Sequence, residues 1–283
     1  MPARDGLPDR LRLGAISLAG LVLVLFFVYR GFPYDQLAEN LAARVGHAMN
    51  VRITVQDVAP RLALLGPGIE ATDVRIVRND GNMLRIDRAR LRPAWSLAWF
   101  RGDPAVHAEI ETPLGAADGL LVLGDRRSWS GDLAGVDLTL LAAEIAWPGV
   151  NLTGTVDAKL DVEMGDGGPV GTCSFEAREG SLSLAAMPIP VPFATLQGEL
   201  EFGGDQLVEL HDVRLEGPLV TADLSGTIGQ AQYFTDAPLN LEVDLSADPP
   251  VRDALSQFGV RVGRRSGEAK IRITGTPSVP KVR

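Results

Sequence analysis

The side chains that carry most enzyme chemistry are few in this sequence, and they lie far apart. His47, His107 and His211 are the three histidines, and none stands at a metal-binding spacing such as H-E-x-x-H. Cys173 is the only cysteine, so it cannot form an internal disulfide or a cysteine metal cluster. The sequence also has no G-x-S-x-G motif and no phosphate-binding loop. We therefore expect a protein that is not an enzyme, with no catalytic residue, no cofactor and no metal site.

Positive charge is concentrated in one short stretch, residues 83–92. Its arginines are Arg85, Arg88, Arg90 and Arg92. One interpretation is a contact with anionic lipid head groups close to a membrane. The other, which we favour, is a solvated strand face that is partly neutralised by Asp80 and Asp87.

Composition limits the class of protein and its partners. The chain has 283 residues and a formal net charge of −9. An acidic chain lacks the basic surface that phosphate backbones require, so we expect no nucleic-acid partner. Its 31 glycines and 19 prolines favour short strands joined by turns over long helices.

Residues 13–31 are predicted to form a transmembrane anchor. The run LGAISLAGLVLVLFFVY at 13–29 carries no charge, and a bilayer-spanning helix needs about 20 apolar residues. A cleaved signal peptide is the main alternative, but no small-residue cleavage pattern follows the run. The predicted anchor residues are Leu13, Ile16, Leu18, Leu21, Val22, Leu23, Val24, Leu25, Phe26, Phe27, Val28 and Tyr29.

The flanking charges predict an orientation and a domain organisation. Arg4, Arg10 and Arg12 precede the apolar run, and basic residues stay in the cytoplasm. Residues 1–12 are then a cytoplasmic tail, 32–276 a β-rich domain outside the cytoplasm, and 277–283 a polar tail. A sub-division is expected near 187–193, where three prolines keep the chain extended.

Alternation of apolar and polar residues dominates from residue 105 onward, and it predicts antiparallel strands throughout. One face of these strands is apolar and needs cover. Either the sheet packs on itself as a sandwich, or it curls into a groove for acyl chains. Glycines within strands, at Gly154, Gly198, Gly226 and Gly275, predict bulges or bends that are compatible with the groove. The candidate groove residues are Val156, Leu160, Val162, Leu196, Leu200, Phe202, Val220, Leu224, Ile228, Leu241, Val243 and Leu245.

Several segments resemble a group of bacterial envelope proteins. After the apolar run come VRITV at 51–55, GPGIEATDVRI at 66–76 and LRIDRARL at 84–91, which resemble the opening of AsmA-like proteins. Later segments resemble the related type II secretion protein N (GspN) group: PVPF at 190–193, LQGELEF at 196–202, LEGP at 215–218 and GTIG at 226–229.

The resemblance implies a mainly β fold, in which an N-terminal transmembrane helix precedes an elongated, curved antiparallel sheet with few short helices. It implies a single-pass anchor in the bacterial inner membrane and a periplasmic domain. It further implies a non-catalytic assembly or structural role beside other subunits of a type II secretion system. The wider AsmA-like group implies the alternative, an apolar β-groove that carries lipid such as phospholipid or lipopolysaccharide.

Overall fold

The structure is a computed structural model of the whole chain. It describes residues 51–63, 66–78, 83–95, 103–123, 127–145, 150–165, 168–184, 187–203, 206–231, 234–249, 251–252 and 267–282, with scattered positions between 20 and 46. Most of the predicted anchor therefore lies outside the described residues. Of its members, Leu23 and Phe27 are described; both are helical, and they are 54% and 64% exposed. No helix formed by described residues has the length and apolar character needed to cross a bilayer.

The described chain is mainly β, as predicted. Fourteen strands form one open antiparallel sheet, and their order in the sheet is their order in the sequence. The first seven strands are β1 (Val51–Ala63), β2 (Gly66–Arg78), β3 (Met83–Pro93), β4 (Ala105–Thr112), β5 (Gly115–Val122), β6 (Arg127–Asp137) and β7 (Val150–Gly165). The other seven are β8 (Gly168–Leu184), β9 (Met187–Gly203), β10 (Gln206–Glu216), β11 (Val220–Gly229), β12 (Leu239–Ala247), β13 (Glu268–Thr276) and β14 (Val279–Val282). The described strands therefore belong to one sheet and not to two separate sheets.

The chain divides into two compact units, Met1–Leu84 and Arg85–Arg283. The first contains the hairpin of β1 and β2, paired from Val51 opposite Arg78 to Ala63 opposite Gly66. Arg61 and Glu70 form an ion pair across this hairpin. The expected sub-division near 187–193 is not where the chain divides, because β9 runs through it without interruption.

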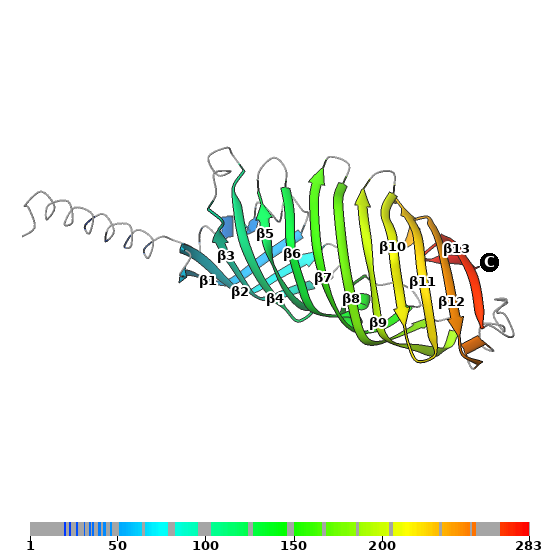
Figure 1. Cartoon of the computed structure of the whole chain (residues 1–283). Helices are drawn as coiled ribbons and strands as arrows, with labels where there is room; N and C mark the ends of the chain where they lie inside the picture. Colours follow the sequence, from blue (N-terminus) through cyan, green and yellow to red (C-terminus); the bar gives the residue numbers. More distant parts are fainter. Residues whose placement is uncertain are drawn as a thin grey trace, which may run out of the picture. The chain divides into compact units, whose positions relative to one another are not determined.

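The second unit contains the strands that carry the predicted groove. Neighbouring strands from β4 to β14 are antiparallel, and many of them bend along their length, so this part of the sheet is curved (Figure 1). The segment expected as a polar tail contains β14, which pairs with β13 from Thr276 opposite Val279 to Ile273 opposite Val282.

Bulges interrupt the pairing on three alternate strands of this region, β6, β8 and β10. The bulged residue of each has a positive φ: Gly135 at 61° in β6, Glu179 at 51° in β8 and Asp212 at 48° in β10. The pairing shifts register beside each of them. An extra residue bends a strand and increases its twist. A line of bulges on alternate strands therefore bends the sheet across several strands.

Three of the four glycines that predicted bends lie beside these bulges rather than in them, whereas Gly275 lies in a regularly paired part of β13. Gly154 lies at the register shift between Thr153 and Thr155, opposite the bulge of β8. Gly198 lies opposite the bulge of β10, and an added Cβ there would come within 2.7 Å of Val213 Cγ2. At Gly154 and Gly198 the sequence pattern thus located irregular positions, but the extra residue belongs to the neighbouring strand.

One helix departs from the expected all-β pattern after residue 105. α3 (Leu138–Ile145) follows β6 directly, and it lies against β7. A 3-10 turn, η2 (Phe234–Asp236), precedes β12, and residues 249, 251 and 252 are helical.

Candidate functional site

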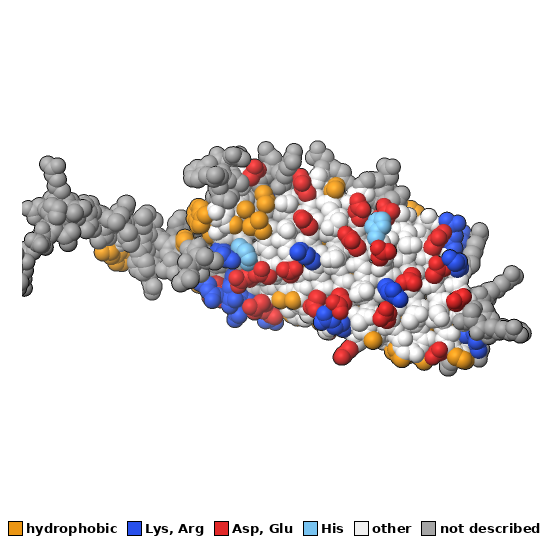
Figure 2. All heavy atoms as spheres, in the orientation of Figure 1, with side chains coloured by type: hydrophobic (Ala, Val, Ile, Leu, Met, Phe, Trp, Pro, Cys, Tyr) orange, Lys and Arg blue, Asp and Glu red, His pale blue; other side chains and the backbone are white. Residues whose placement is uncertain are grey.

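The twelve predicted groove residues all lie on the apolar face of the second unit. Val220 is buried, and the other eleven are half-buried, whereas the residues that alternate with them are mostly exposed. Asp157, Lys159 and Asp161 on β7 show this alternation clearly. Figure 2 shows acidic and basic side chains scattered over an exposed face of the sheet with few hydrophobic ones between them.

The strand register aligns the apolar residues in continuous rows across the sheet. One row runs from β7 to β13 through Leu160, Cys173, Leu200, Leu210, Gly226, Leu241 and Ile273. A second runs from β7 to β12 through Val162, Gly171, Phe202, Val208, Ile228 and Leu239. Side chains directly opposite each other on one face are in contact distance, so each row forms an apolar strip that is interrupted once, by a glycine.

Part of the apolar face is covered by a helix. Leu138 of α3 is buried in a cluster with Ala177 and Phe193, and Val156 and Leu196 pack against this cluster. A second cluster contains Val220, Ala247 and Val251, with Leu245 packed against it. Four of the twelve predicted residues therefore belong to a packed core rather than to a free groove.

The remaining eight residues belong to neither of these clusters, which are drawn from the described residues. All eight are half-buried. We call them the open rows: Leu160, Val162, Leu200, Phe202, Leu224, Ile228, Leu241 and Val243. Over the described chain, the buried hydrophobic residues are few, and none of its large side chains is below 2% exposure. The open rows are the part of the predicted groove that lies outside both packed clusters.

Helix α3 was missed by the sequence reasoning, although its start carries a signal. Asp137 Oδ1 accepts hydrogen bonds from the backbone N–H groups of Thr139 and Leu140 at 2.7 and 3.3 Å, so it caps the helix. Leu138 and Leu141 follow at helical spacing and face the sheet. The sequence signal for this helix is an acidic capping residue followed by two apolar residues that are three positions apart.

Cys173 lies within the first apolar row, between Leu160 and Leu200. It is free and half-buried, and this partial burial raises the pKa of its thiol. A raised pKa keeps the thiol protonated at neutral pH. These properties fit the small apolar residue that the sequence predicts and not a nucleophile.

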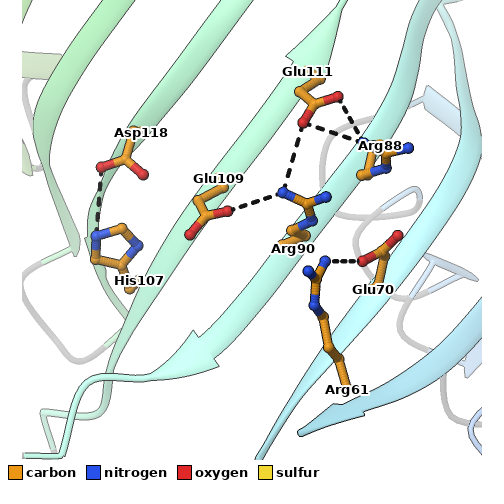
Figure 3. A network of polar contacts seen from close by, with 8 residues as sticks. All are labelled: Arg61, Glu70, Arg88, Arg90, His107, Glu109, Glu111 and Asp118. Atoms are coloured by element: carbon orange, nitrogen blue, oxygen red, sulfur yellow. Dashed lines mark hydrogen bonds and ion pairs between the residues drawn. The ribbon is translucent and has the colours of Figure 1, made fainter. Parts of the chain in front are cut away.

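Three of the four arginines of β3 are paired with acidic side chains. Arg88 Nη1 lies 3.2 Å from Glu111 Oε2, and Arg90 Nη1 lies 3.3 Å from Glu109 Oε2, both across to β4 (Figure 3). Arg85 Nε lies 3.1 Å from Asp87 Oδ1 on its own strand. This pairing favours the solvated strand face over a binding site for anionic lipid.

Two histidines that looked isolated in the sequence each lie beside two carboxylates in the sheet. His107 is grouped with Glu109 and Asp118, and His211 with Glu201 and Glu209; within each group the ligand atoms lie within 4.8 Å of one another. Spacing along the chain could not reveal these groups, because one carboxylate of each comes from the neighbouring strand.

Comparison with protein-family models, with curated proteins and with solved structures finds no match for this chain. The site is therefore defined by its own geometry: the apolar face of an antiparallel sheet, where four of the twelve predicted residues belong to packed clusters and eight do not.

Proposed function

We propose that this chain is a non-catalytic, membrane-anchored module of the bacterial envelope that binds lipid acyl chains along the open rows. The observation that supports this most directly is the set of eight half-buried apolar residues that join neither packed cluster. Each methylene group transferred from water to such a surface gains about 0.8 kcal/mol. The six strands from β7 to β12, at about 4.8 Å apart, give the open rows a length of roughly 24 Å.

The proposed location follows from the same features and from the predicted anchor. A single helix at residues 13–31 would hold the chain in the inner membrane, with the sheet in the periplasm. The phospholipid or lipopolysaccharide of that envelope would supply the acyl chains. Water-soluble ligands suit the open rows poorly, because no titratable side chain is among their eight residues.

The secretion role implied by the resemblance to the GspN group is a second candidate. The polar face supports it, because exposed charged residues on alternate positions leave that face available to protein partners. A subunit of a type II secretion apparatus would use these contacts for assembly. The two candidates use opposite faces of the same strands, so they are separable by mutation.

The binding proposal is tested with two adjacent substitutions on β11. Leu224→Lys places a charge in the open rows, and Ser225→Lys places the same charge on the exposed face one residue later. The purified full-length chain is mixed with a phospholipid that carries a fluorescent acyl chain. We expect Leu224→Lys to weaken binding roughly tenfold or more, because a leucine contact is replaced by an unpaired ammonium group.

Ser225→Lys is expected to bind the phospholipid like the parent chain, and circular dichroism checks that both variants fold. Equal loss in both variants, or no binding by the parent chain, would overturn the proposal. An in-frame deletion in the host then separates the two candidates. A leaky outer membrane with normal secretion supports lipid binding, whereas loss of secreted enzymes with an intact barrier supports the secretion subunit.

A further inference from the structure

We propose that His211, Glu201 and Glu209 form a binding site for a divalent transition-metal ion of the zinc class on the polar face of β9 and β10. This inference is independent of the lipid proposal, because these side chains alternate with the apolar residues of the open rows. It rests on the distances within the group, on its charge, and on comparison with the similar group around His107.

The distances are close to those of a metal site. His211 Nε2 lies 3.5 Å from Glu201 Oε2 and 3.8 Å from Glu209 Oε1. Nitrogen and oxygen ligands bound tetrahedrally at 2.0–2.1 Å to one zinc ion lie about 3.4 Å apart. The three ligand atoms are therefore too far apart for good hydrogen bonds, and small side-chain rotations would converge them on one ion.

The imidazole nitrogen that faces the carboxylates has no hydrogen-bond partner. His211 Nε2 is buried as an atom, and no hydrogen bond from the described residues reaches it. A buried polar atom without a partner is unfavourable, and metal coordination would satisfy it. The His211 side chain as a whole is 43% exposed, and that of Glu201 is 61% exposed, so the group lies at the protein surface.

The charge of the group also favours a cation. Glu201 and Glu209 are directly opposite each other on neighbouring antiparallel strands. Like charges in this arrangement are destabilising. Glu199 is opposite His211 on β9, and Asp212 follows it at the bulge of β10, so the surroundings add negative charge. The outer neighbours, Thr172 on β8 and Thr227 on β11, are neutral.

The group around His107 also consists of one histidine and two carboxylates, but its charge balance is different. Glu109 is opposite Asp118, and His107 Nε2 lies 3.4 Å from Asp118 Oδ1. Here, however, Glu109 is paired with Arg90 at 3.3 Å (Figure 3). No Lys or Arg ion pair to Glu201 or Glu209 is found among the described residues. The chain thus contains one group neutralised by an arginine and one that is not.

The ligand types indicate the class of metal. Imidazole favours zinc and its transition-metal neighbours, and carboxylates accept them at similar distances, whereas magnesium and calcium prefer sites made of oxygen alone. Three protein ligands leave a fourth position for water or for a group from another molecule. A bound ion would link β9 to β10 immediately beside the bulge.

Titration of the full-length, EDTA-treated chain with zinc chloride tests the inference, read by calorimetry and by thermal melting. We expect one zinc ion per chain to bind at this group and to raise the melting temperature. His211→Ala should weaken zinc binding at least tenfold and remove the rise in melting temperature. His107→Ala, the matched control, should bind zinc as the parent chain does.

A third variant separates metal binding from a purely structural role. Glu201→Gln relieves the repulsion between the opposed carboxylates, so the metal-free protein should melt no lower than the parent. The same variant should lose the rise in melting temperature that zinc produces. The inference is wrong if the parent chain binds no zinc, if His211→Ala binds it normally, or if His107→Ala loses it equally.

Discussion

The side chain of Asp137 caps helix α3. Its carboxylate accepts two backbone N–H groups at the start of α3, and these hydrogen bonds hold the pKa of the carboxyl below its ordinary value. Leu138, the next residue, is buried against the sheet. The cap therefore positions the helix that covers Val156 and Leu196 and separates the packed part of the apolar face from the open rows.

Removing this cap should destabilise the protein. At neutral pH we expect Asp137→Ala to lower the melting temperature by a few degrees, because two helix N–H groups lose their acceptor. A carboxyl with a lowered folded-state pKa stabilises the protein above its unfolded pKa of about 3.9, and this contribution is lost as pH falls through the folded value. The difference in melting temperature between the parent chain and Asp137→Ala should therefore become smaller at acidic pH.

Asp137→Asn is the control for this prediction, because asparagine also caps helices but does not titrate. It should melt close to the parent chain at neutral pH. Thermal melting followed by circular dichroism across the acidic range measures both effects. The assignment of Asp137 as an ionised cap would be contradicted if the difference in melting temperature between the parent chain and Asp137→Ala stayed constant down to the most acidic pH.

At the scale of elements, the sequence predicts the strands, but it does not predict which elements pack on their apolar face. Alternation in residues 152–164 predicts the half-buried and exposed positions of β7 well, up to Met164, which is 56% exposed. Alternation reports which face of a strand is apolar, but it does not report what packs there. The start of α3 has a local signal at Asp137, but the packing of this helix on β7 and the pairing of His211 with Glu201 depend on contacts between elements.

The bulges on alternate strands are also visible in the sequence only indirectly, because the glycine that suggests a bend lies on the neighbouring strand. Glu179 in β8 has φ of 51°, a left-handed conformation that costs a residue with a side chain about 1 kcal/mol. Glycine adopts this conformation readily. The glycine of the pattern, Gly154, is instead on the opposite strand.

Glycine at position 179 should therefore be tolerated, unlike glycine in a regular strand. We expect Glu179→Gly to leave the free energy of unfolding unchanged or slightly raised, because relief of the backbone strain offsets the added chain entropy. Thr221→Gly, at a regularly paired position of β11, should lower it by about 1 kcal/mol. Urea denaturation of both variants measures the difference, and equal losses would mean that the strain at Glu179 is negligible.

At the scale of the whole molecule, pairing length differs greatly between strands. β7 and β8 pair from Val150 opposite Leu184 to Gly165 opposite Gly168, and β8 pairs almost as extensively with β9. β14 pairs only through four positions. The packed cluster around Leu138 also lies over these central strands. Stability within the second unit should therefore be highest at β7 to β9.

Hydrogen exchange should reveal this gradient. We expect backbone amides of β7, β8 and β9 to exchange roughly tenfold slower or more than those of β13 and β14, because long ladders and buried side chains resist local opening. Mass spectrometry of peptides from the full-length chain, at neutral pH, measures the rates strand by strand. Uniform protection from β7 to β14 would show instead that the second unit opens as one cooperative body.

The strand order of this sheet also bears on how such a protein can change in length. Because each strand pairs with those before and after it in the chain, one more hairpin could be inserted between two existing strands without altering any distant pairing. Each inserted hairpin would extend the sheet by two strand spacings, about 9.6 Å. Gene duplication of hairpins can therefore adjust the reach of such a molecule in regular increments while every inherited contact between strands is retained.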